Sequence, residues 1–299
     1  MEPTTLPLRH ALLAVAIMAV WGSNFVVMKS GLEHLPPLFF AGLRFTLAAF
    51  PLVFLLPRPP VAWSNLAAYG LFIGFGQFGL VFTALNGHIS PALASLVAQV
   101  QVFFTIGLAF VLNGERISAL QGGSLVLAAS GLVVIGMHTD AQTSLAGLLL
   151  MLGAALCWAL GNMVGRKAGR INMLAYIAWS SLFAAPPLFA LSWLMEGEVA
   201  IAKGVAESDL GTWAAVVWQT LGNSLFGYGA WSWLLSRHPA ALVTPMALLV
   251  PLFGFAASAL WLGEPLPFWK LAAAALVMAG LSVNLLAPFL RRQDTENTR

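Results

Sequence analysis

Long runs of apolar residues fill almost the whole chain, separated by short segments that carry Pro, Gly and charged residues. A helix needs about 20 apolar residues to cross the ~30 Å hydrocarbon core of a bilayer, and the runs have that length. Because backbone polar groups in lipid must be satisfied within their own segment, and because β-barrel alternation is absent, we expect helices. The pattern predicts ten membrane-spanning helices, over residues 10–31, 36–56, 66–86, 92–112, 120–137, 145–164, 174–194, 212–235, 240–262 and 267–289.

The connections between the predicted spans are mostly short. The longest extends from Met195 to Gly211, and a polar tail follows Leu290. The apolar run after Arg9 is expected to be the first membrane helix rather than a cleaved signal peptide, because further spans follow it.

Composition supports a membrane protein. Of the 299 residues, 60% are hydrophobic and only 8% are charged, whereas a soluble domain has roughly 25% charged residues. The net charge of +3 does not indicate a nucleic-acid partner, because the basic residues lie in short loops between the predicted helices. The single cysteine, Cys157, lies in an apolar run, so we expect no intrachain disulfide.

The positive charges predict how the helices are oriented. With the N-terminus in the cytoplasm, only Lys203 and Lys270 lie in loops on the other side, while Lys29 lies at a helix end there. The cytoplasmic loops and tails then hold Arg9, Arg58, Arg116, Arg166, Lys167, Arg170, Arg237, Arg291, Arg292 and Arg299. Because cytoplasmic loops carry an excess of Lys and Arg, both termini are expected in the cytoplasm.

Matching residues recur in the two halves of the chain, at offsets of 138, 150 and 149 residues. They pair Asn24, Lys29 and Gly31 with Asn162, Lys167 and Gly169; Gly79 and His88 with Gly229 and His238; and Gly114, Glu115 and Gly131 with Gly263, Glu264 and Gly280. These consistent offsets indicate an internal repeat. We predict two five-helix units, residues 1–142 and 143–290, followed by a cytoplasmic tail, residues 291–299.

Five helices per unit is an odd number, so the second unit would enter the membrane from the opposite side. The predicted fold is therefore an all-α polytopic membrane protein of ten helices in two inverted repeats. Secondary transporters are built in this way, since two inverted halves can alternate between outward-open and inward-open shapes around one central site.

The chain shows no sign of enzyme chemistry. It has no GxSxG, Walker or HExxH motif and no cluster of metal ligands, so we expect no catalytic residue, metal or cofactor. All eleven carboxylates fall in loops, at helix ends or in the tails. Glu115 and Glu264, each after a Gly at the end of a span, are expected to form a turn or to cap the next helix. Since ion-coupled carriers usually need an ionisable group inside the bundle, we predict passive, gradient-driven transport.

Neutral polar and aromatic side chains near mid-depth form the candidate substrate site. They are Trp21, Asn24, Gln77, Gln99, Gln101, Trp158, Asn162, Trp179, Asn223 and Tyr228. Amides in hydrocarbon are costly without partners, so they should face the interior, where they either hold helices together or hydrogen-bond a zwitterion. The tryptophans either pack in the core or contact the apolar part of a substrate.

Arg44 is the most unusual charge, because it lies within the second predicted span. Its side chain either reaches the outer interface or caps neighbouring carbonyl groups, or it anchors a substrate carboxylate. Its position about a third of the way into the span does not decide between these roles.

Several segments resemble the EamA-type exporters of the drug/metabolite transporter superfamily. They are WGSNFVVMKSGL (21–32), PPLFFAGLRF (36–45), SPALASLVAQVQVFFT (90–105) with NGERI (113–117), and LLVPLFGFAASALWLGEPL (248–266). The likeness extends over nearly the whole chain, and it is closest to exporters of O-acetylserine and cysteine and to aromatic amino-acid exporters of the YddG type.

This resemblance implies ten helices in two inverted repeats, a cavity lined by spans 1, 3, 4, 6, 8 and 9, and a location in the bacterial inner membrane. The leading hypothesis is an exporter of aromatic and other neutral amino acids that works by alternating access. O-acetylserine, cysteine, another metabolite or a nucleotide sugar are alternative cargoes. A membrane-embedded enzyme or a non-transporting scaffold are alternatives of another class, and the oligomeric state stays open.

Overall fold

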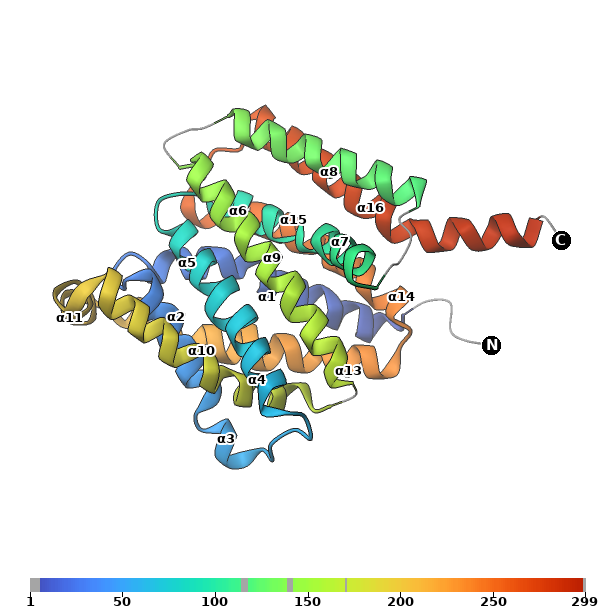
Figure 1. Cartoon of the computed structure of the whole chain (residues 1–299). Coiled ribbons are helices and arrows are strands. Elements are labelled where there is room, and N and C mark those ends of the chain that lie inside the picture. Colours follow the sequence, from blue (N-terminus) through green and yellow to red (C-terminus); the bar gives the residue numbers. More distant parts are fainter. Residues whose placement is uncertain (1–5, 114–117, 139–141, 170, 298–299) are drawn as a thin grey trace.

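The computed structural model describes residues 6–113, 118–138, 142–169 and 171–297, and every regular element in these ranges is a helix (Figure 1). The elements are α1 (Leu8–Gly31), α2 (Pro37–Ala49), α3 (Leu52–Leu55), α4 (Trp63–Tyr69), η1 (Gly70–Phe78), α5 (Gly79–Leu85), α6 (Pro91–Ala98), α7 (Gln101–Asn113), α8 (Ala119–Met137), α9 (Leu145–Ala168), α10 (Met173–Met195), α11 (Gly197–Glu207), α12 (Leu210–Trp218), η2 (Gln219–Tyr228), α13 (Gly229–Arg237), α14 (Ala240–Val243), η3 (Thr244–Leu248), α15 (Leu249–Leu262) and α16 (Phe268–Asn297). The predicted all-helical class is confirmed for this part of the chain.

Nine helical stretches in the described ranges are long and apolar enough to cross a membrane. Each overlaps one predicted span. The eighth predicted span, 212–235, is not among the nine, although α12, η2 and α13 form an unbroken helical run from Leu210 to Arg237. Gln219, Asn223 and Ser224 lie in the middle of this run and make it less apolar than the others.

Two predicted spans are interrupted within the bundle. The second divides into α2 and α3 at Phe50, whose backbone is extended because the residue before a proline is driven away from the helical conformation. The fourth divides into α6 and α7 at Gln99 and Val100. A break at membrane depth is tolerated where the backbone lines a cavity, which is the position of Gln99.

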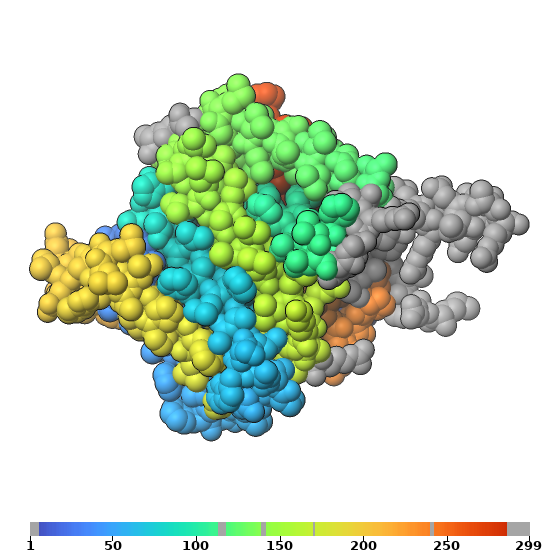
Figure 2. Space-filling view, viewed as in Figure 1, coloured from blue at the N-terminus to red at the C-terminus, as the bar shows by residue number. Residues whose placement is uncertain are grey.

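The long connection after Met195 contains a helix, α11, that the apolar pattern did not predict. With the end of α10 it projects from the rest of the bundle, in yellow (Figures 1 and 2). Asp209 then caps α12 by accepting hydrogen bonds from the Thr212 backbone N–H, at 2.7 Å, and from the Thr212 hydroxyl, at 2.8 Å. These bonds favour the carboxylate and lower the pKa of Asp209.

The last helix is also longer than predicted. The sequence indicated an end near residue 289 and a separate tail, but α16 runs on to Asn297. The predicted cap at Glu115 lies outside the described ranges.

Two π-helical segments occupy matching places in the halves of the chain. The first residues of η1 and η2 are 149 positions apart, and their last residues are 150 apart. Most π-helices are single turns inside α-helices and lie near functional sites. Their recurrence at the offset of the sequence repeat indicates that the two halves share a local backbone feature as well as residues.

Small residues allow helices to approach closely. Helices α8 and α16 lie side by side along one edge of the bundle (Figure 1). A Cβ at Gly131 would meet the Ala273 carbonyl oxygen and Val277, and a Cβ at Gly280 would meet the Ser124 carbonyl oxygen. These two glycines are one of the pairs matched in the sequence, and only residues without a side chain fit this crossing.

Large apolar side chains on the outside suit a lipid environment. Leu194, Leu260 and Phe268 are 79%, 83% and 85% exposed, respectively. In water such exposure over many helices would favour aggregation, whereas lipid tails accept it.

Candidate functional site

A cavity of about 460 Å³ lies among the helices. Its wall comes from α1, the α4–η1–α5 run, α6, α7, α9, α10, the η2–α13 run, η3, α15 and α16. Nine of the ten predicted site residues line it: Trp21, Asn24, Gln77, Gln99, Gln101, Trp158, Asn162, Asn223 and Tyr228. Amides that are far apart in the sequence therefore face one interior space, as their cost in hydrocarbon predicts.

Trp179 is the exception, because it lies outside this cavity. Its indole Nε1 donates to the Leu56 carbonyl oxygen at 3.1 Å, and its ring contacts Trp63 edge to face. Depth along a helix suggested a site residue, but the direction of the side chain around the helix excludes it from the cavity wall.

The sequence argument did not single out several wall residues. They include Phe25, Met28, Tyr69, Phe78, Trp231, Leu281 and Leu285. Trp231 could have been found, since it lies three positions after Tyr228 and so shares its helix face. Leu281 and Leu285 belong to α16, a span that the resemblance did not place around the cavity.

Asn24 and Gln219 form a reciprocal amide pair. Asn24 Nδ2 donates to Gln219 Oε1 at 3.2 Å, and Gln219 Nε2 donates to Asn24 Oδ1 at 2.9 Å. Both side chains are buried, so the pair joins α1 to η2 in a medium of low polarity. Gln219 was not predicted as a site residue. Its partner Asn24 uses its amide oxygen and amide nitrogen in this pair, so the pair stabilises the fold.

A second amide pair is more open. Asn162 Nδ2 donates to Gln101 Oε1 at 3.0 Å, and the Thr105 hydroxyl shares that oxygen at 3.4 Å. Both amides lie in the cavity wall and are only partly buried. This bond does not use Gln101 Nε2 or Asn162 Oδ1, so these groups could bind a ligand in the cavity.

Gln77 provides an acceptor without a partner. Its Oε1 atom is buried and accepts no hydrogen bond from any described residue. Buried polar groups are almost always paired with protein or water, so an unpaired one needs an explanation, and a bound ligand is one. The atom belongs to η1 and to the cavity wall.

Aromatic rings form one side of the cavity. Trp21 contacts Tyr228 and Trp231, with ring centroids 5.3 and 5.6 Å away, and donates from Nε1 to the Asn223 carbonyl oxygen at 3.3 Å. The described wall residues include no Asp, Glu, Lys, Arg or His. The cavity therefore offers neutral hydrogen-bonding groups and π surfaces rather than charges.

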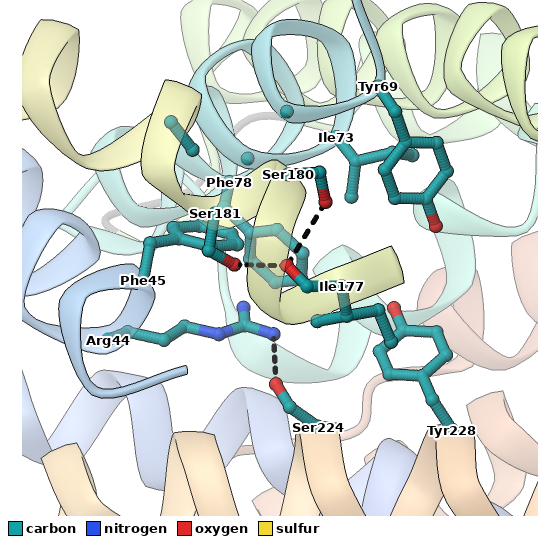
Figure 3. A pocket seen from close by; sticks show the side chains of 13 residues that line it. Arg44, Phe45, Tyr69, Ile73, Phe78, Ile177, Ser180, Ser181, Ser224 and Tyr228 are labelled. Carbon is teal, nitrogen blue, oxygen red and sulfur yellow. Dashed lines mark hydrogen bonds between the residues drawn. The ribbon is translucent and has the colours of Figure 1, made fainter. Parts of the chain in front are cut away.

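A smaller pocket of about 20 Å³ adjoins this cavity and contains Arg44 (Figure 3). Arg44 is 1% exposed, so its side chain does not reach the membrane interface, which was one of its predicted roles. Its Nη2 atom donates to the Ser224 hydroxyl on η2 at 3.3 Å, and its guanidinium carbon lies 3.6 Å from the centre of the Phe78 ring. The side chain thus extends from α2 into the bundle.

A buried ion pair lies at the end of the bundle where α1 finishes, called here the far end. Lys270 Nζ and Glu264 Oε1 are 2.9 Å apart, and Glu264 Oε2 accepts from the Ser258 hydroxyl and, at 3.3 Å, from the Ala92 backbone N–H. Glu264 was predicted to form a turn or to cap the next helix. The helix that its carboxylate caps is α6, far away in the sequence, so three helices are joined here.

The end where α1 begins, called here the N-terminal end, is held by different contacts. His10 Nδ1 and His238 Nε2 are 2.7 Å apart, and Asn65 Nδ2 donates to the Val164 carbonyl oxygen at 3.1 Å. The cavity wall reaches towards this end, since it includes Met173, the first residue of α10. Among the described residues, no group of three or more His, Cys, Asp or Glu side chains is arranged to hold a metal ion.

Comparison with known proteins gives a family match. The model of the EamA-like transporter family matches residues 8–137 and again residues 145–286. A protein of Salmonella typhimurium strain LT2 named "Probable amino-acid metabolite efflux pump" is 39% identical, over 95% of this chain and 97% of its own length. A protein of Escherichia coli K12 with the same name is 37% identical, over 93% and 95% of the two chains.

More distant matches agree with the fold. The uncharacterized transporter YoaV of Bacillus subtilis is 27% identical, over 93% of this chain and 97% of its own length. A solved structure titled "Crystal structure of protein" has a TM-score of 0.63 at 20% identity, over 93% of this chain and 96% of that one. At this identity the solved structure supports the fold alone.

Proposed function

The chain belongs to the EamA-like transporter family and is a multi-pass protein of the bacterial inner membrane, and we propose that it exports aromatic and other neutral amino acids. As a member of this family it is a transporter rather than an enzyme. The observation that carries the proposal is the central cavity, whose wall combines amides with large aromatic rings.

The volume and the chemistry of the cavity suit this cargo. About 460 Å³ lies within the range of roughly 300–1,000 Å³ that is usual for small-molecule sites. Amides at Gln77, Gln99 and Gln101 offer donors and acceptors to a zwitterion, and Trp21 and Trp158 offer surfaces to an aromatic or aliphatic side chain. The names of the Salmonella and E. coli relatives support both the cargo class and the direction of transport.

The proposed architecture has ten membrane helices in two inverted five-helix repeats, residues 1–142 and 143–290, with both termini and the tail 291–299 in the cytoplasm. The run from Leu210 to Arg237, the eighth in chain order, adds one membrane helix to the nine described above. Two successive matches of one family model and the matching π-helical segments support the repeat. The excess of Lys and Arg in the proposed cytoplasmic loops supports the orientation.

In this orientation the N-terminal end faces the cytoplasm, and we propose that the structure corresponds to an inward-facing state. The wall of the cavity includes Met173 and Thr244 towards the cytoplasmic side, while the buried Glu264–Lys270 pair ties the helices together on the periplasmic side. Alternating access would release this pair as the cytoplasmic side closes.

We further propose that transport is driven by the substrate gradient alone. The cavity wall has no described carboxylate or histidine that could carry a coupled proton. Flux measured with and without a proton gradient tests this point. Strict dependence on the gradient, with no exchange of substrate in its absence, would contradict passive transport.

Proteoliposomes provide the test of the function. We expect uptake of labelled aromatic and neutral amino acids above that of empty vesicles, in a panel that also contains O-acetylserine and cysteine. Gln99→Ala and Trp158→Ala should each lower the flux by about fivefold or more, the effect of losing one hydrogen bond or one ring contact. Absence of amino-acid flux would overturn the proposed cargo, and normal flux in both variants would overturn the proposed lining.

A further inference from the structure

Arg44 is a buried cation that has no role in the substrate site proposed above. We propose that its guanidinium group binds the carboxylate of the transported amino acid, in a subsite that joins the main cavity when the aromatic side chains between them move. This inference rests on the proposed function, because it identifies which end of the substrate is held and where.

No carboxylate of the described part of the chain forms an ion pair with Arg44, whose side chain is 1% exposed. A buried charge is costly without an opposite charge or a full set of hydrogen bonds. The ring faces of Phe78 and Phe45, with centroids 3.6 and 4.9 Å from the guanidinium carbon, offset part of this cost. They leave the positive charge itself without a negative partner.

Two of the three guanidinium nitrogens have no acceptor among the described residues. Nη2 donates to Ser224, but Nε and Nη1 are buried and make no hydrogen bond with any described residue. A carboxylate is the ligand that matches such donors best, since its two oxygens accept from the planar fork of a guanidinium group.

The hydroxyl groups near Arg44 are already oriented as acceptors. Ser180 and Ser181 both donate to the Ile177 carbonyl oxygen, at 3.1 and 2.7 Å, and Ser224 donates to the Gln219 carbonyl oxygen at 3.0 Å. Their protons are therefore engaged with the backbone, and of these three hydroxyl groups Ser224 accepts from Arg44 while Ser180 and Ser181 lie in the wall of the same pocket (Figure 3).

The subsite lies directly beside the main cavity. Tyr69, Phe78 and Tyr228 belong to the walls of both spaces, so these three side chains separate Arg44 from the proposed substrate. In Figure 3 the two tyrosines lie on one side of the small pocket, with their hydroxyl groups directed towards one another. Either phenol is a donor that could add to the binding of an anionic oxygen.

The volume of the small pocket requires movement. About 20 Å³ holds one water molecule but not a carboxylate group. The substrate carboxylate therefore reaches Arg44 only when Phe78 or Tyr228 turns away. Both residues are the last of a π-helical segment, a local feature that is frequent at functional sites.

The test compares L-phenylalanine with L-phenylalaninamide, which keeps the ring and the ammonium group but has no carboxylate. Binding to purified protein is followed by tryptophan fluorescence or thermal shift, and flux by proteoliposomes. The variants are Arg44→Gln and Arg44→Lys, with the exposed Arg58→Gln as a matched control.

We expect wild-type protein to bind phenylalanine at least tenfold more tightly than the amide, since hydrogen bonds to charged groups contribute about that factor. Arg44→Gln should reduce this ratio about tenfold, Arg44→Lys should reduce it less, and Arg58→Gln should leave it unchanged. The ratio, unlike total activity, does not fall merely because a variant is unstable.

If wild-type protein binds phenylalanine and phenylalaninamide with affinities within about twofold of each other, the proposal is overturned, whatever the variants show. An unchanged ratio in Arg44→Gln also overturns it and shows that Arg44 only connects α2 to η2. Absence of flux in wild type, with the binding ratio as expected, overturns the proposed function but leaves the carboxylate site established.

Discussion

The amides in and next to the cavity wall differ in their hydrogen bonding, although the sequence pattern does not distinguish them. Asn24 and Gln219 satisfy each other by two hydrogen bonds, whereas the Gln77 oxygen has no partner among the described residues. A paired amide stabilises the fold, and an unpaired one is available to a ligand. Substitutions should separate these roles.

Asn24→Leu is expected to lower the free energy of unfolding by about 1–3 kcal/mol, because it leaves the buried Gln219 amide without its partner. The midpoint of thermal unfolding in detergent measures the loss. Gln219→Leu should have a similar effect, and the double variant should recover part of it, since no polar group is then left unpaired. If the two losses simply add, the pair does not stabilise the protein as proposed.

Gln77→Leu should have the opposite effects, on thermal stability and on substrate flux. Thermal stability is expected to stay constant or to rise, because the substitution removes a buried acceptor that has no partner. Substrate flux in proteoliposomes should fall by about fivefold or more if the oxygen accepts from the substrate ammonium group. A variant that loses stability but keeps its flux per folded molecule would show that Gln77 is structural.

Single residues could be predicted in part. The cost of a polar group in hydrocarbon was enough to place six amides and Tyr228 at the cavity. It was not enough for Trp179, because an indole ring is stable on any apolar face and its N–H finds a carbonyl there. Arg44 stayed undecided until its burial was known.

At the scale of the helices, contacts without side chains set the packing between α1 and α15. A Cβ at Gly22 would meet the carbonyl oxygen of Val250, the Cβ of Phe253 and the backbone nitrogen of Gly254. None of these atoms can move by a change of rotamer. Both helices contribute to the cavity wall, so their separation also sets its shape.

Gly22→Ala is therefore expected to destabilise the protein by about 1–3 kcal/mol, the usual cost of overpacking. Thermal unfolding in detergent is the measurement. Gly123→Ala, on exposed α8 with no atom near the added Cβ, is the matched control and should not lower the midpoint. Equal behaviour of the two variants would mean that α1 and α15 separate freely.

Helix positions followed closely from the apolar pattern, but interruptions did not. The end of α2 could have been inferred from Pro51, whereas the break at Gln99 and Val100 contains neither Gly nor Pro. Helix α11 was missed because its charged residues suggested a loop. The length of the apolar runs predicts which segments cross the membrane, and tertiary contacts decide where they bend.

At the scale of the whole molecule, the Glu264–Lys270 pair joins α6, α15 and the start of α16 at the far end. Glu264→Gln is expected to lower the free energy of unfolding by about 3–5 kcal/mol, because it leaves the buried ammonium group without this carboxylate. Replacing both partners, as Glu264→Gln with Lys270→Met, should restore part of the thermal midpoint. A double variant no better than the single one would argue against an ion pair in the native state.

The orientation is tested with impermeant maleimide on cells that express a Cys157→Ala background. A cysteine at Lys203, on exposed α11, should react from outside, and a cysteine at Ser236, near the end of α13, should react only after permeabilisation. The opposite pattern would reverse the proposed topology and with it the assignment of an inward-facing state.

The all-helical class could be predicted from the apolar runs, and the described residues confirm it. The repeat stays a prediction, which the π-helical segments, 149 and 150 positions apart, and the two family matches support. The contacts at the far end could not be predicted. Glu264 and Lys270 are six positions apart in the sequence, but the contact of Glu264 with the α6 N–H group depends on how distant helices assemble.

The π-helical segments have one further consequence. A turn closed by i→i+5 bonds holds about one residue more than an α-helical turn, so each segment carries a surplus residue within a rod of fixed length. When such a surplus migrates along a helix, each side chain that it passes turns by about 100° around the axis while the ends stay in place. Phe78 and Tyr228 are the last residues of these segments. In each half of the chain, a shift of the π-helical segment would therefore change the direction of one wall side chain without a tilt of the whole repeat.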